Sequence, residues 1–286
     1  MWPIWVTEHI SGVPVTSLSS THQLIEFTMS ENEESFESYF KKFGHISSIH
    51  EWIKRHDAPK AISIYAHNRI KDTIIDNVAK DGTLLEVGCG YGFLFQRLNS
   101  REFTCDGLYG TEISPSLSKS TKLNVPESEV LVSRAEDLPF VDSVFDTVVC
   151  SEVIEHVSDP YVVIQELSRV TKVGGNVILT TPNYSAVRFG VDRLIQKLGF
   201  LKIDDDTRAV RDHPIPEKDL KRYVSNSNLT LFKLEYLSPI PEIRYLKKVP
   251  NNVMRFLISA TRFIERTPLM KKIFCNQLVF IAIKRE

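Results

Sequence analysis

Three closely spaced glycines give the first chemical signal in this sequence. The stretch TLLEVGCGYG, residues 83–92, places Gly88, Gly90 and Gly92 directly after a run of apolar residues. Glycine has no side chain to bury, so this spacing indicates either a tight turn or a backbone that comes close to a ligand. The loop alone leaves these two interpretations equally open.

An acidic residue further along favours the ligand. Glu112 lies near the end of the next predicted strand, 24 residues after Gly88. A carboxylate about 20 residues after such a loop can accept hydrogen bonds from both hydroxyls of a ribose. The sequence therefore predicts an adenine nucleoside as ligand. At this point NAD, FAD and S-adenosylmethionine all fit.

A second chemical group follows the fourth predicted strand. In SEVIEHV, a helix would place Glu152, Glu155 and His156 on one face, where they could converge on a metal ion or a substrate hydroxyl. His213, in the later loop RDHPIPEKDL, is a second candidate. A single histidine in a loop is more often a structural residue, but together with His156 it becomes a plausible part of one site.

Alternating strands and helices must position these residues. Short apolar runs that alternate with helical patterns predict a Rossmann-like, doubly wound α/β fold, in which a seven-stranded, mostly parallel sheet has helices on both faces. The last strand is a candidate for antiparallel pairing. The predicted strands are 83–88, 108–114, 129–135, 145–153, 176–182, 230–238 and 277–285. The predicted helices are 58–79, 92–100, 114–124, 161–171, which Gly174 and Gly175 would close, and 217–227.

Five segments in this order resemble the class I S-adenosylmethionine-dependent methyltransferases, and most closely the methyltransferase type 11 and type 23 groups. They are LLEVGCGYG, YGTEIS, RAEDLPFVDSVFDTVVC, SEVIEHVSDP and ELSRVTKVGGNVILTTPN. Each segment is a loose match by itself, but all five occur at the usual spacing, and the resemblance extends from about residue 58 to residue 286. The G-x-G-x-G spacing also differs from the G-x-G-x-x-G of a dinucleotide loop, which argues against NAD.

The resemblance implies that S-adenosylmethionine is the cofactor and gives roles to the matching residues. The residues that would line its methionine and ribose part are Glu86, Gly88, Cys89, Gly90 and Gly92. Glu112 would hold the ribose hydroxyls, with Ile113 against the adenine. Those that would meet the adenine edge are Ala135 and Glu136, and those that would face the sulfonium are Cys150 and Ser151.

One position departs from the family pattern. The family often has Asp or Asn just before Ala135, whereas this chain has Arg134, so Glu136 is a candidate to replace that contact to the adenine. Arg69, on the helix before the first strand, is a candidate partner for the cofactor carboxylate, although a surface role is the more common one for an arginine.

Methyl transfer requires alignment of the nucleophile with the methyl group, and an oxygen nucleophile also needs a base. We predict Glu152, His156 and His213 as the catalytic residues. Similar E-x-x-E-H segments bind magnesium in ubiquinone-pathway O-methyltransferases and small-RNA 2′-O-methyltransferases, but they also occur in relatives without a known metal. We therefore favour ordering of the loop over a metal site, for which Glu152, Glu155 and His156 would be the ligands, and predict no metal.

Charge and periodicity of the later segments bear on the acceptor. Residues 239–286 contain ten Lys or Arg against three Glu, so the remainder of the chain is acidic, since the net charge is -1. Helical inserts are predicted at 184–210 and 240–274. In residues 251–273 an arginine stripe lies opposite an apolar face, which fits a helix packed on the domain edge or, as the sharper hypothesis, peripheral contact with an anionic membrane.

These observations define the expected organisation. Residues 1–28 are predicted as a flexible N-terminal arm, 29–82 as an N-terminal helical segment and 83–286 as the methyltransferase domain, with Met29 as an alternative start. The chain shows no secretory signal, no membrane span and no metal-ligand spacing among its four cysteines, so a cytoplasmic protein is expected, with membrane association as an alternative.

The predicted function is methyl transfer to oxygen of a small or lipid-like molecule. The alternative is an RNA 2′-O- or protein-directed methyltransferase, which the EVIEH segment favours. The acidic body and the lack of a basic, aromatic platform oppose it, so nucleic acid is not the expected partner. The oligomeric state is left open.

Overall fold

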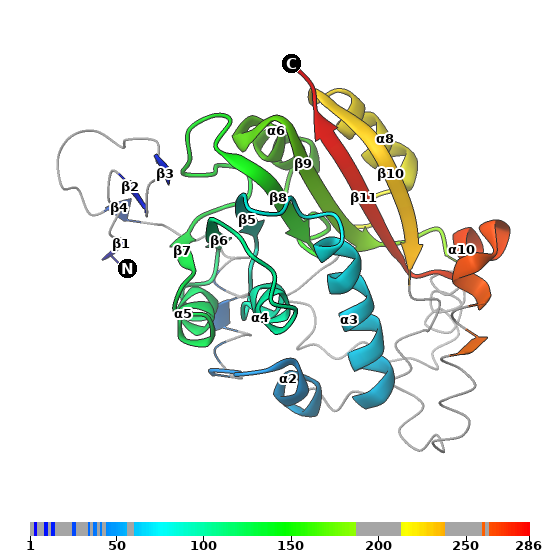
Figure 1. Ribbon diagram of the computed structural model, residues 1–286, viewed down its shortest axis with the longest axis horizontal. Helices are drawn as coiled ribbons and strands as arrows, with labels where there is room; N and C mark the ends of the chain where they lie inside the picture. Colours follow the sequence, from blue (N-terminus) through cyan, green and yellow to red (C-terminus); the bar gives the residue numbers. More distant parts are fainter. Residues whose placement is uncertain are drawn as a thin grey trace.

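The computed structural model describes residues 44–55, 60–186, 213–237 and 263–286, with short pieces at 3–4, 9–10, 13–14, 25–26, 34, 37–38, 41 and 259–260 (Figure 1). Most of the predicted inserts at 184–210 and 240–274, including residues 251–258 of the amphipathic stretch, lie outside these residues. Within the described part of the chain, no helix combines the length and the hydropathy needed to cross a bilayer.

Among the described residues, seven strands form one sheet in the order β10-β11-β9-β8-β5-β6-β7 (Figure 1). The strands are β5 (Thr83–Val87), β6 (Gly107–Glu112), β7 (Glu129–Val132), β8 (Phe145–Ser151), β9 (Thr171–Pro182), β10 (Leu229–Leu237) and β11 (Gln277–Lys284). Neighbours among β5 to β9 are parallel, whereas β11 is antiparallel to both β9 and β10. The predicted seven-stranded, mostly parallel sheet with an antiparallel last strand is confirmed.

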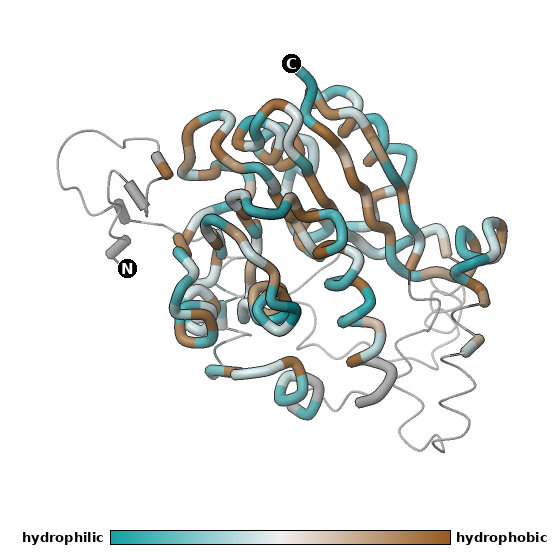
Figure 2. Tube along the Cα trace, viewed as in Figure 1, coloured by the Kyte–Doolittle hydropathy of each residue, from teal (hydrophilic) through white to brown (hydrophobic). Residues whose placement is uncertain are grey.

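Helices pack on both faces of the sheet. The helices are α2 (Ile49–Arg55), α3 (Lys60–Ile75), α4 (Phe93–Ser100), α5 (Pro115–Asn124), α6 (Pro160–Val170), α8 (Glu217–Ser225) and α10 (Pro268–Phe274). Apolar residues of α3 and α4 share one core with the sheet, while those of α6 and α8 form the core on its other side. Figure 2 shows hydrophobic residues along the strands of the sheet, whereas hydrophobic and hydrophilic residues alternate along the helices.

Capping residues explain where two of these helices begin. The Ser114 hydroxyl accepts a hydrogen bond from the Leu117 amide at 3.2 Å at the start of α5. Asp159 accepts from the amides of Tyr161 and Val162 at 3.0 and 3.3 Å at the start of α6. In both cases proline follows the cap, where its fixed φ suits the first helical position and its missing N–H costs nothing.

The start of β9 differs from the prediction. The strand begins at Thr171, directly after α6, whereas Gly174 and Gly175 were predicted to close the helix. Gly174 has φ +79°, and a Cβ on Gly175 would lie 2.9 Å from the carbonyl oxygen of Asp146. The register between β8 and β9 shifts at this point, so the two glycines allow a strand irregularity where backbones approach too closely for a side chain.

The first residues contain short strand pairs. β1 (Pro3–Ile4) pairs with β4 (Ile25–Glu26), and β2 (His9–Ile10) pairs with β3 (Val13–Pro14), both antiparallel. Val13 is buried in the same core as α6 and α8. The structure thus brings one residue of the predicted N-terminal arm to the core, and the division into arm, helical segment and domain stays a prediction.

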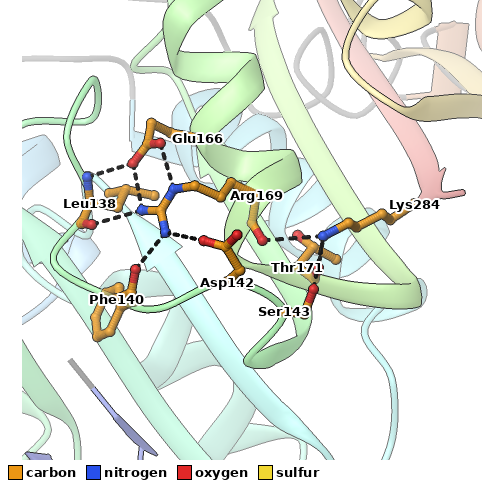
Figure 3. A network of polar contacts seen from close by, with 8 residues as sticks. All are labelled: Leu138, Phe140, Asp142, Ser143, Glu166, Arg169, Thr171 and Lys284. Carbon is orange, nitrogen blue, oxygen red and sulfur yellow. Dashed lines mark hydrogen bonds and ion pairs between the residues drawn. The ribbon is translucent and has the colours of Figure 1, made fainter. Parts of the chain in front are cut away.

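At the amino-terminal edge of the parallel strands, Arg169 at the end of α6 holds the loop before β8 (Figure 3). Its Nε and one terminal nitrogen donate to the Glu166 carboxylate at 2.7 and 2.8 Å. The other terminal nitrogen donates to Asp142 at 2.9 Å, and the carbonyl oxygens of Leu138 and Phe140 accept at 2.9 and 2.6 Å. The guanidinium is therefore fully used in holding this loop to α6.

Lys284, at the end of β11, fastens the last strand to the same loop (Figure 3). Its ammonium donates to the hydroxyl of Ser143 at 3.0 Å and to the carbonyl oxygens of Arg169 and Thr171 at 3.2 and 2.8 Å. Because Lys284 comes from an antiparallel strand, its side chain reaches the edge where the parallel strands begin. Hydrogen bonds from the charged groups of Arg169 and Lys284 thus hold this edge of the sheet together.

Candidate active site

The glycine loop connects β5 to α4 at the carboxyl edge of the sheet. Gly88 has φ +73°, and a Cβ there would lie 2.3 Å from Val153 Cγ2; Gly92 has φ +74°, and a Cβ there would lie 2.9 Å from Thr121 Cγ2. The fold itself therefore requires these two glycines. Gly90 also has a positive φ, +56°, but nothing lies within 4 Å of its added Cβ. The loop thus presents open space at Gly90.

Glu112 at the end of β6 is fixed beside this space. Its two carboxylate oxygens accept hydrogen bonds from the amides of Gly90 and Ser114, at 2.9 and 3.0 Å. Burial raises the pKa of Glu112, while these backbone hydrogen bonds lower it and the nearby carboxylate of Glu37 raises it further. The structure therefore holds Glu112 in one orientation against the glycine loop, and its role in binding a ribose stays a prediction.

The two cysteines of the predicted site belong to the core. The Cys89 thiol lies 3.7 Å from the Thr121 hydroxyl, and a Cβ on Gly110 would lie 2.9 Å from its sulfur. Cys150 is fully buried, and burial is the main cause that raises the pKa of both thiols. Both side chains are engaged in packing, so any contact of Cys89 with a ligand would come from its backbone.

Residues beyond β7 lie beside Glu112. Val132 pairs with Glu112, and the amide that follows, of Ser133, donates to the Glu112 carbonyl at 3.1 Å. Ala135 is buried, and the Glu136 carboxylate accepts from the Ser158 amide at 3.2 Å. Ile113 is half-buried at the end of β6. The structure therefore brings the residues predicted for the adenine side to one edge.

Glu86, on β5, is buried, and one oxygen of its carboxylate lacks a hydrogen-bond partner among the described residues. Its Oε2 makes no hydrogen bond to any residue that the structure describes. Burial raises the pKa of Glu86 to about 8, against the lowering effect of the Lys71 charge and with a raising effect of Glu112. A buried carboxylate oxygen of this kind calls for a donor that the described residues do not supply.

Lys71, on α3, is a functional candidate that was not predicted. It is 8% exposed, and burial lowers the pKa of its ammonium, while the carboxylates of Glu86 and Glu152 raise it. His67, one turn earlier, is half-buried with its Nε2 atom buried, and burial and the Lys71 charge lower its pKa well below the usual value. Their spacing of four on the helix before the glycine loop is the signal that could have identified them.

Arg69, which was predicted to meet the cofactor carboxylate, is engaged elsewhere. Its Nε lies 3.4 Å from the Glu265 carboxylate, and a terminal nitrogen donates to the Thr73 hydroxyl at 3.0 Å. These contacts direct the guanidinium toward the segment before α10. The geometry does not support the role predicted for Arg69, and Lys71 is the better candidate for it.

The segment after β8 forms a turn rather than a helix. Glu152 has the left-handed φ of +57°, and the His156 amide donates to the Val153 carbonyl at 2.9 Å. The helical face that would gather Glu152, Glu155 and His156 is therefore not formed. Among the residues that the structure describes, no group of three or more His, Cys, Asp or Glu side chains is arranged to hold a metal ion.

The carboxylates in this turn contact the neighbouring strands. Glu152 accepts from the Thr180 hydroxyl at 2.9 Å and from the Gln277 amide nitrogen at 3.1 Å. Glu155 is buried and accepts from the Thr181 hydroxyl at 3.1 Å. The half-buried Ser151 has its hydroxyl 2.9 Å from that of Thr180. Glu152 and Ser151 therefore share one polar network across β8 and β9.

The structure also brings the two predicted histidine loops together. The His213 amide donates to the Glu155 carbonyl at 2.7 Å, so the loop before α8 lies against the turn that contains His156. His213 is exposed and His156 is half-buried. Their roles in catalysis stay predictions.

Comparisons with known proteins agree with this arrangement. Residues 85–179 match the family model described as a methyltransferase domain. The chain is 33% identical over 138 residues to a ubiquinone biosynthesis O-methyltransferase of Xanthomonas campestris pv. campestris (strain B100), covering 45% of this chain and 55% of that protein. It is 33% identical over 129 residues to that of Pseudomonas paraeruginosa (strain DSM 24068 / PA7), covering 41% and 53%. The chain thus spans about half the length of these curated relatives.

Solved structures share the fold at low identity. A possible histamine N-methyltransferase from Thermotoga maritima has a TM-score of 0.58 at 16% identity, covering 89% of this chain and all (100%) of that one. The geranyl diphosphate C-methyltransferase of Streptomyces coelicolor A3(2) also has a TM-score of 0.58 at 16% identity, covering 90% and 100%. The match over residues 85–179, together with the sheet order and the glycine loop, shows that this part of the chain is a methyltransferase domain of the class I S-adenosylmethionine-dependent type.

Proposed function

We propose that the chain transfers a methyl group from S-adenosylmethionine to an oxygen of a small or lipid-like molecule. The observation that carries the cofactor is the open space at Gly90, whose amide donates to the Glu112 carboxylate. The carboxylate of Glu86, which interacts with that of Glu112, is buried and has an oxygen without a hydrogen-bond partner among the described residues. Methyltransferases of this fold act on many acceptors, so the acceptor must be inferred from the site rather than from the fold.

The polar groups at this edge fit the cofactor. Glu112 can accept from two ribose hydroxyls because each of its oxygens has a further lone pair beyond the backbone bond. The free oxygen of Glu86 suits the methionine ammonium, and the buried ammonium of Lys71 suits the methionine carboxylate. The bound cofactor would supply an electrophilic methyl group on its sulfonium.

The residues after β8 would handle the acceptor. Glu152, His156 and His213 lie in two adjoining loops at the edge where the parallel strands end, which suits removal of a hydroxyl proton. The matched relatives named as O-methyltransferases support oxygen as the acceptor atom. The concentration of carboxylates at this edge opposes the alternative of an RNA acceptor, whose phosphates would be repelled.

The cofactor assignment is tested with Glu112→Ala, measured by titration calorimetry with S-adenosylmethionine. We expect binding to weaken by about 1.5–3 kcal/mol, because hydrogen bonds to a charged group are lost. Glu129→Ala is the matched control, since Glu129 lies on the neighbouring strand β7 and is 38% exposed. An unchanged affinity of Glu112→Ala would reject the assignment.

We also propose peripheral contact of the chain with an anionic membrane, as the described part of the 251–273 stretch suggests. α10 buries none of its side chains, and Phe263 and Leu269 are 65% and 70% exposed close to the basic Lys271 and Lys272. Each basic residue near an anionic surface contributes about 1 kcal/mol at moderate salt. Neutralising Arg266, Lys271 and Lys272 should therefore sharply reduce sedimentation with phosphatidylserine vesicles. A wild type that ignores such vesicles at low salt would contradict the proposal.

A further inference from the structure

We propose that the methyl acceptor binds at the amino end of β11 through Gln277 and Glu152, offers a hydrogen-bond donor there and carries no negative charge. The acceptor class is thus an alcohol or phenol that is uncharged or that also carries an amine. This inference rests on the proposed methyl transfer and specifies the kind of molecule that receives the methyl group.

The side chain of Gln277 lies beside the predicted catalytic carboxylate of Glu152 and has an acceptor atom without a hydrogen-bond partner among the described residues. It is the first residue of β11 and pairs with Pro182 at the end of β9, so its side chain belongs to the edge where the parallel strands end. Its amide nitrogen donates to Glu152 at 3.1 Å. Its Oε1 is buried and has no hydrogen-bond partner among the described residues. Such an orphaned oxygen is costly, and a donor on a ligand would satisfy it.

Glu152 is held rigidly for the same ligand. The Thr180 hydroxyl donates to one of its oxygens at 2.9 Å, and Gln277 donates to the other. Its left-handed backbone, with φ +57°, is unfavourable for a residue with a long side chain, and such strain persists where the surrounding contacts impose it. A carboxylate can accept several hydrogen bonds at once, so a bound hydroxyl or ammonium group can donate to Glu152 beside these contacts.

The position of this pair places the acceptor next to the cofactor. The charge of Lys71 interacts with both Glu86 and Glu152, which come from the neighbouring strands β5 and β8. Glu86 belongs to the proposed cofactor side, and Glu152 and Gln277 extend the same row of strands toward β9 and β11. An acceptor at Gln277 would therefore lie alongside the methionine end of the cofactor.

Charge at this edge selects against anions. Glu152 and Glu155 follow directly after β8, and the carboxylates of Glu155, Glu152 and Glu136 each raise the pKa of the buried Cys150 thiol, so negative charge gathers at the end of β8. Glu152 also interacts with the buried ammonium of Lys71, whereas Glu86 holds its proton up to a pKa of about 8 and adds little negative charge below it. A phosphate or carboxylate on the acceptor would meet net repulsion here, whereas an uncharged hydroxyl or an ammonium group would not.

Four benzene derivatives of similar size test the inference: phenol, benzylamine, anisole and benzoate. Their binding to the full chain loaded with S-adenosylhomocysteine is measured by ligand-observed NMR. Phenol and benzylamine should bind roughly five- to tenfold more tightly than anisole, which lacks the donor, and benzoate should bind weakest. Gln277→Leu should reduce the affinity for phenol and benzylamine by roughly tenfold while the affinity for anisole stays the same.

Two further variants make the result specific. Gln165→Leu, on the exposed side of α6, is the matched control and should behave as the wild type. Glu152→Gln keeps the shape of the side chain but removes its charge. This variant should therefore bind benzylamine more weakly, and benzoate more tightly, than the wild type does. The inference would be overturned if the wild type bound anisole as tightly as phenol, bound benzoate most tightly or bound none of the probes. It would also be overturned if Gln277→Leu left the affinity for phenol and benzylamine unchanged.

The cofactor measurement separates this inference from the proposed function. S-adenosylhomocysteine affinity and the melting temperature are recorded for every variant, and both should be unchanged in Gln277→Leu. If the wild type binds no cofactor, the proposed function fails and the acceptor inference fails with it. If it binds the cofactor but shows no preference for donor-bearing probes, only the acceptor inference fails.

Discussion

The two edges of the same sheet differ in how fully their polar and charged groups are hydrogen-bonded. Where the parallel strands begin, every nitrogen of the Arg169 guanidinium donates to a carboxylate or a carbonyl oxygen. Where they end, the buried atoms Glu86 Oε2, His67 Nε2 and Gln277 Oε1 have no hydrogen-bond partner among the described residues. Lys71 is buried beside them, and burial lowers the pKa of its ammonium.

This difference separates residues kept for folding from residues kept for binding. A buried polar group without a partner reduces the free energy of unfolding, so folding alone gives no reason to retain several of them together. They become useful when a ligand supplies the missing donors and acceptors. The contrast therefore predicts opposite outcomes when a charge is removed at each edge.

The largest change in stability is expected at the edge where the parallel strands begin. Arg169→Met should reduce the free energy of unfolding by about 2–4 kcal/mol, because it removes hydrogen bonds to charged groups and leaves the half-buried Glu166 without its cation. Thermal and denaturant unfolding measure the loss. The affinity for S-adenosylmethionine should not change, since the opposite edge is untouched.

A surface arginine gives the matched control for this variant. Arg101 pairs with Asp76 at 3.0 Å and with Asp72 at 3.6 Å, but its side chain is 39% exposed. Arg101→Met should therefore cost less than about 1 kcal/mol. The comparison of edges would be contradicted if Arg169→Met melted like the wild type or lost its cofactor affinity.

The sheet could be predicted from sequence because its signals are local. The apolar run of β8 and the Asp159–Pro160 start of α6 each specify an element within a few residues, and the order of such elements predicts the fold. The start of β9 was missed because adjacent glycines are equally consistent with a helix end and a strand irregularity. Only the close approach of Gly175 to the Asp146 backbone distinguishes them.

The candidate site was predicted unevenly for a related reason. Gly90 and Glu112 lie at strand ends, so their positions relative to the sheet follow from the strand boundaries. Arg69 and Lys71 are two positions apart on α3 and therefore project in different directions, and the side that faces Glu86 depends on how the helix packs. Gln277 was missed because its closeness to Glu152 requires the antiparallel insertion of β11 beside β9.

A smaller change in the free energy of unfolding, of the opposite sign, is expected for Glu86→Gln at the edge where the parallel strands end. The folded chain holds a proton on Glu86 up to a pKa of about 8, mainly because of burial, whereas the unfolded chain releases it near 4.5. The contribution of Glu86 to the free energy of unfolding therefore declines as the pH rises between these two values. Glutamine cannot ionise, so the variant should match the wild type near pH 4.5 and exceed it by about 1–3 kcal/mol at about pH 9.

The same variant should bind S-adenosylmethionine more weakly, because the methionine ammonium would lose its ionised partner. In the wild type, binding below about pH 8 should release a proton from Glu86, which calorimetry in buffers of different ionisation enthalpy detects, and the variant should not show this release. Glu129→Gln, on β7, is the control that should change neither quantity. A Glu86→Gln protein that is less stable than the wild type at high pH, or that keeps full cofactor affinity, would mean that Glu86 is retained for folding. The contrast between the two edges would then no longer separate binding from stability.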